Sequence, residues 1–316
     1  MTELSYAVIG TGAVGGLYGA RLQRVGHEVH FLLHSDFNHV KKHGLMIDSV
    51  DGNFKLRKIN AYRRAADMPK SDVVVITLKA TTNSFLPKIL PHVAKPGGVV
   101  IIIQNGLGAE KYVAGIVPKS TVLGGLSFLC CNKIGPGHIR HIDYGLLTLA
   151  LFTRNGKPGG ITPAMKEIAA DFSNSGTTVK LIDDLILARW KKLVWNIPFN
   201  GLSVLLNAST KELVHNPHTR ALSLALMEET VRGAAAFGRK IPVSFIRKMM
   251  RDTDRMEPYD TSMKLDLNRR KQMEVEAIYG SPLRAARSRG ISLPRMEMLY
   301  QALCLLNCLN IRQSHK

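Results

Sequence analysis

The pattern of hydrophobic and polar positions changes its period part-way along the chain. From Tyr6 to Phe152, short β-rich runs alternate with amphipathic stretches, and continuous Val and Ile runs such as Val73–Ile76 stand among them. Such runs are typical of strands that helices cover on both faces, as in a parallel sheet. This half therefore predicts a doubly wound α/β domain. Its predicted strands are Tyr6–Ile9, Glu28–Leu33, Asp72–Leu78, Val99–Ile103, Thr121–Cys131 and His138–Phe152.

Beyond Asp183 the β signal disappears and a helical period takes over. Gly238 and Pro242 suit the positions just after one helix and at the start of the next. The predicted helices are Leu185–Leu206, Thr219–Phe237, Ser244–Asp254, Ser262–Tyr279 and Met296–Leu309. We therefore predict two domains, an α/β domain over residues 1–180 and an all-helical C-terminal domain over residues 181–316.

The charge balance raises the question of a nucleic-acid partner. The 316 residues include 43 Lys and Arg against 24 Asp and Glu, a net charge of +19, and such surfaces attract phosphate backbones. The basic residues are nevertheless scattered in twos and threes, and no basic stretch is interleaved with aromatic residues. Examples are Lys41–Lys42, Arg63–Arg64 and Arg269–Lys271. A solvated surface that draws in small anions is the better interpretation, and we expect no nucleic-acid partner.

The compartment is predicted from what the chain lacks. Its apolar runs are far shorter than the roughly 20 residues that a membrane span requires, and no charged region followed by a cleavage site opens the sequence. We expect a cytoplasmic protein without a membrane partner. The four cysteines, Cys130, Cys131, Cys304 and Cys308, belong to no recognisable metal pattern. We therefore expect buried thiols and no metal.

The segment YAVIGTGAVGG places Gly10, Gly12 and Gly15 in G-x-G-x-x-G spacing, directly after the first strand and before a helical segment. The first glycine permits a tight turn, the second lets the backbone approach a pyrophosphate, and the third allows the helix to pack closely on the strand. Amides at the start of the helix would bind the phosphates. A tight turn without a ligand is the alternative, but it leaves the glycines unexplained. The predicted cofactor-binding residues of this Rossmann-type loop are Gly10, Thr11, Gly12, Ala13, Val14 and Gly15.

The end of the second strand decides between the two nicotinamide dinucleotides. An acid there would hold the ribose hydroxyls of NAD, whereas a basic group would favour the NADP phosphate. That end carries His34 and Ser35, with Asp36 just beyond and Lys41–Lys42 further on. These signals are mixed but favour NADP, with His34 as a further cofactor-binding residue.

Two other strand ends carry polar side chains at the edge where open α/β sheets bind their ligands. Lys79 follows VVVITL, and Gln104 and Asn105 follow VVIII. Each alone is more often a solvated strand end. Together, above a dinucleotide fold, Lys79 and Asn105 are candidates for contacts to cofactor and substrate.

The segment RWKKLVWNIPFN places Lys192, Asn196 and Asn200 at intervals of four among apolar residues. Successive i+4 steps drift by only about 40° around a helix, so the three polar groups share one face. Reduction of a carbonyl needs a proton donor and groups that fix the substrate, and an ammonium beside two amides supplies both. In the alternative, Lys192 reaches solvent and the asparagines contact backbone. Pro198 is expected to kink this helix.

Taken together, these segments resemble the ketopantoate reductase (2-dehydropantoate 2-reductase) family over nearly the whole chain. The resemblance rests on IGTGAVGGLYG, TLKA, QNGLG, GPGHIRH, RWKKLVWNIPFNGLS, TSMKLDLNRRKQMEVEAIYG and ARSRGISLP. It implies NADPH-dependent reduction of 2-dehydropantoate to D-pantoate, in pantothenate and coenzyme A biosynthesis, with a small 2-oxo acid as the partner. A homodimer is one assembly that the sequence leaves open.

The resemblance also implies roles for individual residues. Lys192 would be the general acid, and Glu274 would assist the lysine and the substrate hydroxyl. Asn196, Asn200 and Ser262 would bind substrate, and Lys79 and Asn105 would lie beside the nicotinamide and substrate. From spacing alone, Ser262 and Glu274 are about 120° apart on a straight helix and share a site only if it bends. The alternative for Glu274 is a surface ion pair with Arg270 or Lys271.

Three positions depart from the family pattern. His34 stands where a basic residue is usual, Met273 where threonine is common, and Tyr279 where asparagine is common. Another 2-oxo acid therefore stays open as the substrate. A β-hydroxyacid dehydrogenase is the enzymatic rival, and a non-catalytic dinucleotide-binding sensor is the rival from another class.

Overall fold

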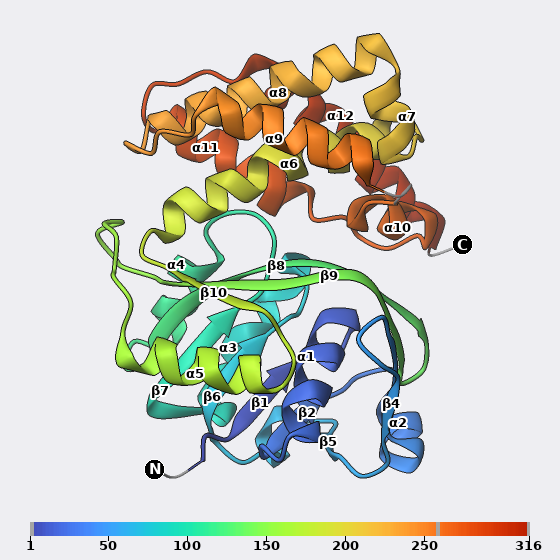
Figure 1. Ribbon diagram of the computed structural model, residues 1–316, viewed down its shortest axis with the longest axis vertical. Coiled ribbons are helices and arrows are strands. Elements are labelled where there is room, and N and C mark those ends of the chain that lie inside the picture. Colours follow the sequence, from blue (N-terminus) through green and yellow to red (C-terminus); the bar gives the residue numbers. More distant parts are fainter. Residues whose placement is uncertain (1–2, 257–259, 315–316) are drawn as a thin grey trace. The chain divides into compact units, whose positions relative to one another are not determined.

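The computed structural model describes residues 3–256 and 260–314, which form two compact units (Figure 1). Unit 1 comprises the residues up to Gln104 together with Ala109–Leu185, and unit 2 comprises Asn105–Gly108 together with the residues from Ile186 onward. The predicted division was a single cut after residue 180. In the structure the cut falls after Leu185, and the short segment Asn105–Gly108 belongs to unit 2 although it follows a strand of unit 1.

Unit 1 is built around one ten-stranded sheet. Its strands are β1 (Tyr6–Ile9), β2 (Val29–Leu32), β3 (Leu45–Ser49), β4 (Phe54–Leu56), β5 (Asn60–Tyr62), β6 (Ser71–Ile76), β7 (Ala94–Ile102), β8 (Thr121–Gly135), β9 (His138–Leu151) and β10 (Val179–Ile182). Their order is β4-β3-β9-β8-β7-β6-β1-β2-β5, and β10 pairs with β9. The strands from β5 to β8 in this order are all parallel, while β9 runs antiparallel to β8. The predicted doubly wound sheet is confirmed.

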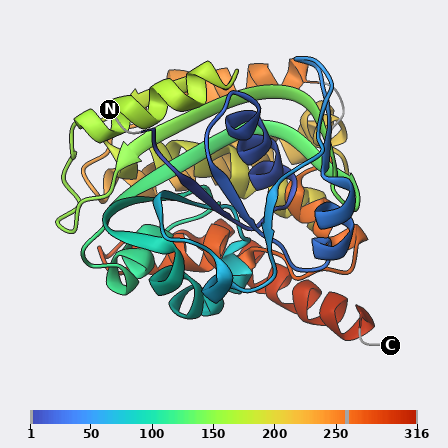
Figure 2. The ribbon, with the colours of Figure 1, turned by 90° about the horizontal axis from the view of Figure 1, so that it is seen from below.

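Helices cover both faces of this sheet. They are α1 (Ala13–Arg24), α2 (Phe37–His43), α3 (Leu86–Val93), α4 (Ala109–Ile116) and α5 (Pro163–Asn174), with the 3₁₀ segments η1 (Ala65–Asp67) and η2 (Ala80–Phe85). Along β1, Tyr6 and Val8 pack with α1 and α5, while Ala7 and Ile9 pack with α3 and α4. Figure 2 shows α5 (yellow-green) and the teal helices α3 and α4 on opposite sides of the strands. Two apolar layers explain the uninterrupted Val and Ile runs.

The sequence does not predict β3, β4, β5 or β10. Each of these strands has between three and five residues and mixes polar with apolar side chains, so neither a continuous apolar run nor a long alternation marks it. β5 matters most for the site because it extends the sheet beyond β2, with Tyr62 opposite Leu32. The end of β5 therefore lies beside the end of β2.

Unit 2 is helical throughout its described residues. Its elements are α6 (Leu185–Leu205), α7 (Thr210–His215), α8 (Pro217–Ala235), α9 (Val243–Arg255), α10 (Ser262–Asn268), the π-helix η3 (Glu276–Gly280), α11 (Ser281–Arg287) and α12 (Pro294–Ser314). α6 continues through Pro198. Its apolar face, including Trp190, Val194 and Ile197, forms the centre of the unit 2 core. The all-helical nature of this half is as predicted.

The predicted single helix Ser262–Tyr279 is wrong. α10 ends at Asn268, and Arg270 adopts a φ of +52°. The Arg270 amide donates to the Leu267 carbonyl at 3.0 Å, and the Lys271 amide donates to the Asp266 carbonyl at 2.8 Å. These two bonds form a Schellman motif, which ends a helix by satisfying its last carbonyls. The sequence hides this stop because an arginine, and not a glycine, takes the left-handed position.

The cysteine side chains are less buried than expected. All four cysteines are free thiols, but Cys308 is exposed and the other three are half-buried, so the expectation of buried thiols is wrong. Among the helices that the structure describes, none is long and apolar enough to cross a membrane. Within the same residues, no group of three or more His, Cys, Asp or Glu side chains could hold a metal ion.

Candidate active site

The loop between β1 and α1 gives each glycine a different task. Gly10 has a φ of +103°, and a Cβ there would lie 2.6 Å from the Leu78 nitrogen. A Cβ on Gly15 would lie 2.2 Å from Thr77 Oγ1, so this glycine allows α1 to pack on the sheet. A Cβ on Gly12 would meet only the Gly10 oxygen, at 4.0 Å. The open side of Gly12 is the space that a pyrophosphate needs.

The start of α1 is suited to an anion. It has no side-chain cap and no acidic residue in its first turn, so the first amides, at Ala13 and Val14, lack intrahelical partners at the positive end of the helix dipole. Thr11 fixes the loop to the next strand because its Oγ1 donates to the Leu32 carbonyl at 3.0 Å. The predicted cofactor residues thus form one loop whose geometry fits a dinucleotide.

Just after β2, His34 and Asp36 differ in their exposure to solvent. His34 and Ser35 are exposed, whereas Asp36 is buried. Asp36 Oδ2 accepts a hydrogen bond from the Gly137 amide at 2.9 Å and pairs with Lys133. Burial alone raises the pKa of Asp36, but the hydrogen bonds from Lys133 and Gly137 outweigh it and hold this pKa below its ordinary value. The Asp36 carboxylate, just beyond the end of β2, is therefore engaged by Lys133 and Gly137.

Lys79 and Gln104 follow β6 and β7 in unit 1. The Lys79 carbonyl accepts hydrogen bonds from the Thr82 amide at 3.0 Å and from Thr82 Oγ1 at 2.8 Å. Gln104 Nε2 donates to the Leu78 carbonyl at 2.7 Å, which joins the two strand ends. Half-buried Lys79 thus stands at the carboxyl edge of the sheet, where the prediction put it.

In unit 2, α6 carries Lys192, Asn196 and Asn200 at the predicted i+4 spacing. Lys192 is half-buried, while Asn196 and Asn200 are 6% and 2% exposed. Asn200 Oδ1 accepts from Ser262 Oγ and from the Met263 amide, both at 3.4 Å. Within the described part of the chain, the Asn196 side chain makes no hydrogen bond. The Asn196 amide can therefore both donate to and accept from a ligand.

Asn105 and Glu274 meet in unit 2, far apart in sequence. Asn105 Nδ2 donates to Glu274 Oε2 at 3.1 Å. Glu274 is only 4% exposed, so the alternative of a surface ion pair with Arg270 or Lys271 is wrong. Because the helix that begins at Ser262 ends before Arg270, Ser262 and Glu274 do not lie on one straight helix and can share a site. Ser262 contacts Asn200, and the charge of Glu274 acts on Lys192.

The π-helix η3 holds the loop that bears Asn105. The Leu107 amide donates to the Ala277 carbonyl at 3.1 Å. Gly106 has a φ of +87°, and a Cβ there would lie 2.1 Å from the Ala277 oxygen. Only glycine fits this approach, and π-helical turns, which are rare, frequently occur at functional sites. Gly106 and Ala277 thus position Asn105 against Glu274.

Burial and two neighbouring charges in unit 2 change the pKa of Lys192. Burial, with help from the Arg189 charge, lowers the pKa of Lys192 to about 7, while the Glu274 charge opposes this shift. An ammonium whose pKa lies near neutral pH is suited to proton donation. Arg189 is 3% exposed and was not among the predicted residues. Its spacing of i−3 from Lys192 on the same helix is the signal that could have found it.

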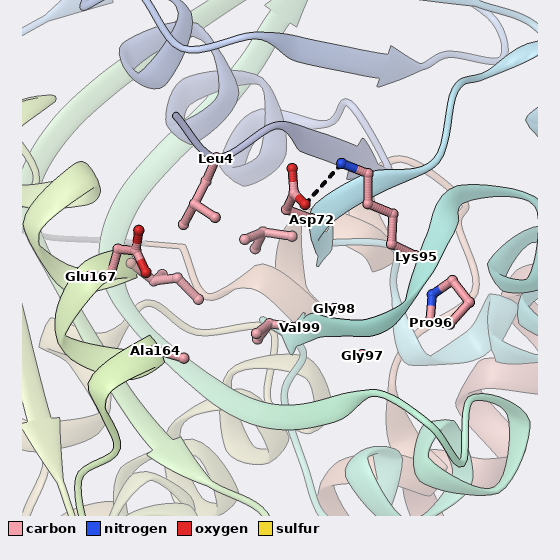
Figure 3. Close-up of a pocket in the computed structure, with 11 residues that line it drawn as sticks. Leu4, Asp72, Lys95, Pro96, Gly97, Gly98, Val99, Ala164 and Glu167 are labelled. Carbon is pink, nitrogen blue, oxygen red and sulfur yellow. Dashed lines mark hydrogen bonds and ion pairs between the residues drawn. The ribbon is translucent and has the colours of Figure 1, made fainter. Parts of the chain in front are cut away.

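A cavity of about 310 Å³ lies elsewhere in unit 1 (Figure 3). The starts of β6 and β7 line it, together with α5. Two of its charged groups pair with each other, because Lys95 Nζ lies 2.8 Å from Asp72 Oδ1, and Ser5 Oγ also donates to Asp72 Oδ2 at 2.6 Å. Open α/β sheets bind ligands at the carboxyl ends of their strands. This cavity, at the amino ends, is not the candidate site.

Family comparisons cover both units. The model of "Ketopantoate reductase PanE/ApbA" matches residues 6–154, and that of "Ketopantoate reductase PanE/ApbA C terminal" matches residues 184–307. The chain belongs to the ketopantoate reductase family. As a ketopantoate reductase family member, it is an oxidoreductase that acts on a CH–OH group.

Individual ketopantoate reductases match over nearly their whole length. A 2-dehydropantoate 2-reductase of Nostoc sp. is 50% identical, over 97% of this chain and 96% of that protein. The crystal structure of 2-dehydropantoate 2-reductase from Geobacter metallireducens is 36% identical, with a TM-score of 0.91, and covers 95% of this chain and 99% of its own. The crystal structure of 2-dehydropantoate 2-reductase from Methylococcus capsulatus is 33% identical, with a TM-score of 0.88, and covers 97% of this chain and 98% of its own.

Proposed function

We propose that this protein is a 2-dehydropantoate 2-reductase, which reduces the C2 ketone of 2-dehydropantoate to the alcohol of D-pantoate at the expense of NADPH. The product would serve pantothenate and coenzyme A biosynthesis. The observation that carries the proposal is the α6 face of unit 2, where Lys192, Asn196 and Asn200 are aligned and Glu274 acts on the lysine. The 50% identity to the Nostoc sp. protein supports the choice of substrate.

The fit of a nicotinamide dinucleotide rests on unit 1. The open side of Gly12 and the uncapped start of α1 suit its pyrophosphate. The engagement of Asp36 by Lys133 and Gly137 removes the acid that would favour NAD, so the proposed cofactor is NADP, with His34 at the ribose. Lys79, at the carboxyl edge of the sheet, is proposed to contact the nicotinamide end. When bound, the reduced nicotinamide supplies two electrons and one hydrogen to C2.

The residues of unit 2 supply the rest of the reaction. Lys192 donates a proton to the ketone oxygen, so that 2-oxo acid, NADPH and one proton become 2-hydroxy acid and NADP⁺. Asn196 and Asn200 hydrogen-bond the substrate, as does Ser262. Glu274 accepts from the substrate hydroxyl and keeps charge on Lys192, while Asn105 orients Glu274 through their hydrogen bond.

Steady-state kinetics with the purified full-length protein test this proposal. The substrates are 2-dehydropantoate, 3-methyl-2-oxobutanoate, which lacks its hydroxymethyl group, and pyruvate, each with NADPH and with NADH. We expect the highest kcat/KM with 2-dehydropantoate and NADPH, and a loss of about tenfold or more without the hydroxyl, because Glu274 would then lose a hydrogen bond.

Two outcomes would replace the proposal with a rival. Oxidation of β-hydroxy acids at a higher kcat/KM than reduction of any 2-oxo acid would identify a β-hydroxyacid dehydrogenase. Dinucleotide binding without turnover of any substrate in the panel would identify a non-catalytic sensor. A preference for 3-methyl-2-oxobutanoate would keep the reaction type and change the substrate.

A further inference from the structure

The pairing of β5 with β2 brings a second basic residue to the predicted ribose position. The Leu33 amide donates to the Tyr62 carbonyl at 2.9 Å, one step beyond the paired residues Leu32 and Tyr62. The two strands are parallel, so both chains leave the sheet at its carboxyl edge. Arg63, which follows Tyr62, therefore lies beside the segment Leu33–His34. The sequence separates Arg63 from His34 too widely for spacing to show this.

The charged side chains near the ends of β2 and β5 differ in whether they have a hydrogen-bond or ion-pair partner. Arg64 is held by Asp67, with Nε donating to Oδ2 at 2.9 Å and Nη2 donating to Oδ1 at 2.6 Å. Asp36 is held by Lys133 and Gly137. Arg63 is exposed and makes no hydrogen bond or ion pair with any residue that the structure describes. It is thus a cation at the end of β5 without an acid to neutralise it.

We propose that Arg63 is the residue that distinguishes NADPH from NADH, by binding the phosphate on the 2′-oxygen of the adenosine ribose. The adenosine ribose lies at the end of the second strand in this fold. A guanidinium offers two parallel N–H donors to phosphate oxygens and stays charged at neutral pH, whereas an imidazole does so only when protonated. Arg63 thereby takes over the task that a basic residue at position 34 would have.

This inference rests on the proposed use of NADPH but adds a residue from another strand. Lys41 is a further basic residue, on α2 just after β2, and its Nζ lies 5.5 Å from the centre of the Phe37 ring. Its flexible ammonium acts as a point charge, which does not provide the paired geometry of a guanidinium. We therefore assign the larger part of the discrimination to Arg63.

Binding of nucleotide fragments tests the inference without turnover. Isothermal titration of the full-length protein with 2′,5′-ADP and with 5′-AMP compares the same site with and without the phosphate, and NADPH and NADH fluorescence titrations repeat the comparison. In Arg63→Met we expect affinity for 2′,5′-ADP and NADPH to fall about tenfold, because a charge-assisted hydrogen bond is lost. Affinity for 5′-AMP and NADH should change less than twofold, and Arg63→Lys should recover part of the loss.

Arg64→Met is the matched control, since it removes the same charge one residue further along, from a guanidinium already paired with Asp67. We expect less than a twofold change for either fragment. A wild-type protein that prefers 2′,5′-ADP, with Arg63→Met retaining that preference or Arg64→Met losing as much, would overturn the role of Arg63 and leave NADPH use standing. A wild-type protein without any preference would overturn both.

Discussion

The two units prepare their ligand sites in opposite ways. In unit 1 the candidate pyrophosphate site consists of backbone: a left-handed Gly10, an open Gly12 and the uncapped start of α1. In unit 2 the candidate substrate site consists of side chains, an ammonium beside two amides on α6, with a buried carboxylate acting on it. The first site depends on the absence of side chains and the second on their burial.

This difference has a physical origin. Pyrophosphate is bound well by amides and a helix dipole, which any sequence supplies if no Cβ stands in the way. Proton donation requires a group whose pKa is matched to the operating pH, and only burial and neighbouring charges can provide that match. Substitutions should therefore damage the two sites by different routes.

The largest effect is expected for Lys192→Ala. Loss of the proton donor and of its charge should lower kcat by two or more orders of magnitude, while the Kd for NADPH, measured by fluorescence titration, changes less than twofold. Lys191→Ala is the control, because Lys191 lies over the Phe245 ring, 5.4 Å from its centre, and has no proposed role. A kcat for Lys192→Ala within threefold of the wild type would remove this lysine from the mechanism.

The next effect separates two glycines of unit 1. Gly12 has a φ of −85°, which alanine adopts, and its Cβ would meet only an oxygen at 4.0 Å. Gly12→Ala should therefore keep the melting temperature and weaken NADPH binding by about tenfold or more, since the methyl group occupies the approach of the pyrophosphate.

Gly15→Ala should have the opposite result, a lower melting temperature with NADPH binding retained. Its Cβ would lie 2.5 Å from the Gly10 oxygen, so overpacking should cost about 1–3 kcal/mol of unfolding free energy. Differential scanning calorimetry of both variants checks the contrast. An unchanged NADPH affinity in a folded Gly12→Ala protein would contradict the open-side argument.

The pH dependence of the reduction should follow Lys192. Its pKa is lowered to about 7, so the ammonium is present below that pH and is lost above it. The kcat/KM for 2-dehydropantoate, which reports the free enzyme, should be level below about pH 7 and fall about tenfold per unit above it. A profile that stays level up to pH 9 would show that another group supplies the proton.

The smallest effect is expected for Glu274→Gln, read on the same profile. The Glu274 charge raises the pKa of Lys192, so its removal should move the inflection to lower pH. Glutamine keeps an oxygen that accepts from Asn105 Nδ2, which preserves the loop. An inflection that moves to higher pH would contradict the assigned coupling.

Much of the fold could be predicted because its signals are local. The glycine spacing, the Val and Ile runs and the i+4 line of Lys192 each lie within one element. The failures lie at turns and short edges: the helix stop at Arg270 uses no glycine, and β5 has three residues. The i−3 spacing puts Arg189 near Lys192, but its effect on the pKa of Lys192 depends on burial, which no spacing shows.

The sequence by itself determined most of the longer elements and the chemical groups they carry, since periods of 2 and 3.6 residues and the special φ of glycine are properties of neighbouring residues. Only the tertiary structure decided which residues contact or act on one another. It joined Asn105 to Glu274, turned Asp36 towards Gly137, placed Arg63 beside the end of β2, and lowered the pKa of Lys192. Strand register, burial and the field of distant charges exist only after the chain has folded, so no spacing along the sequence records them.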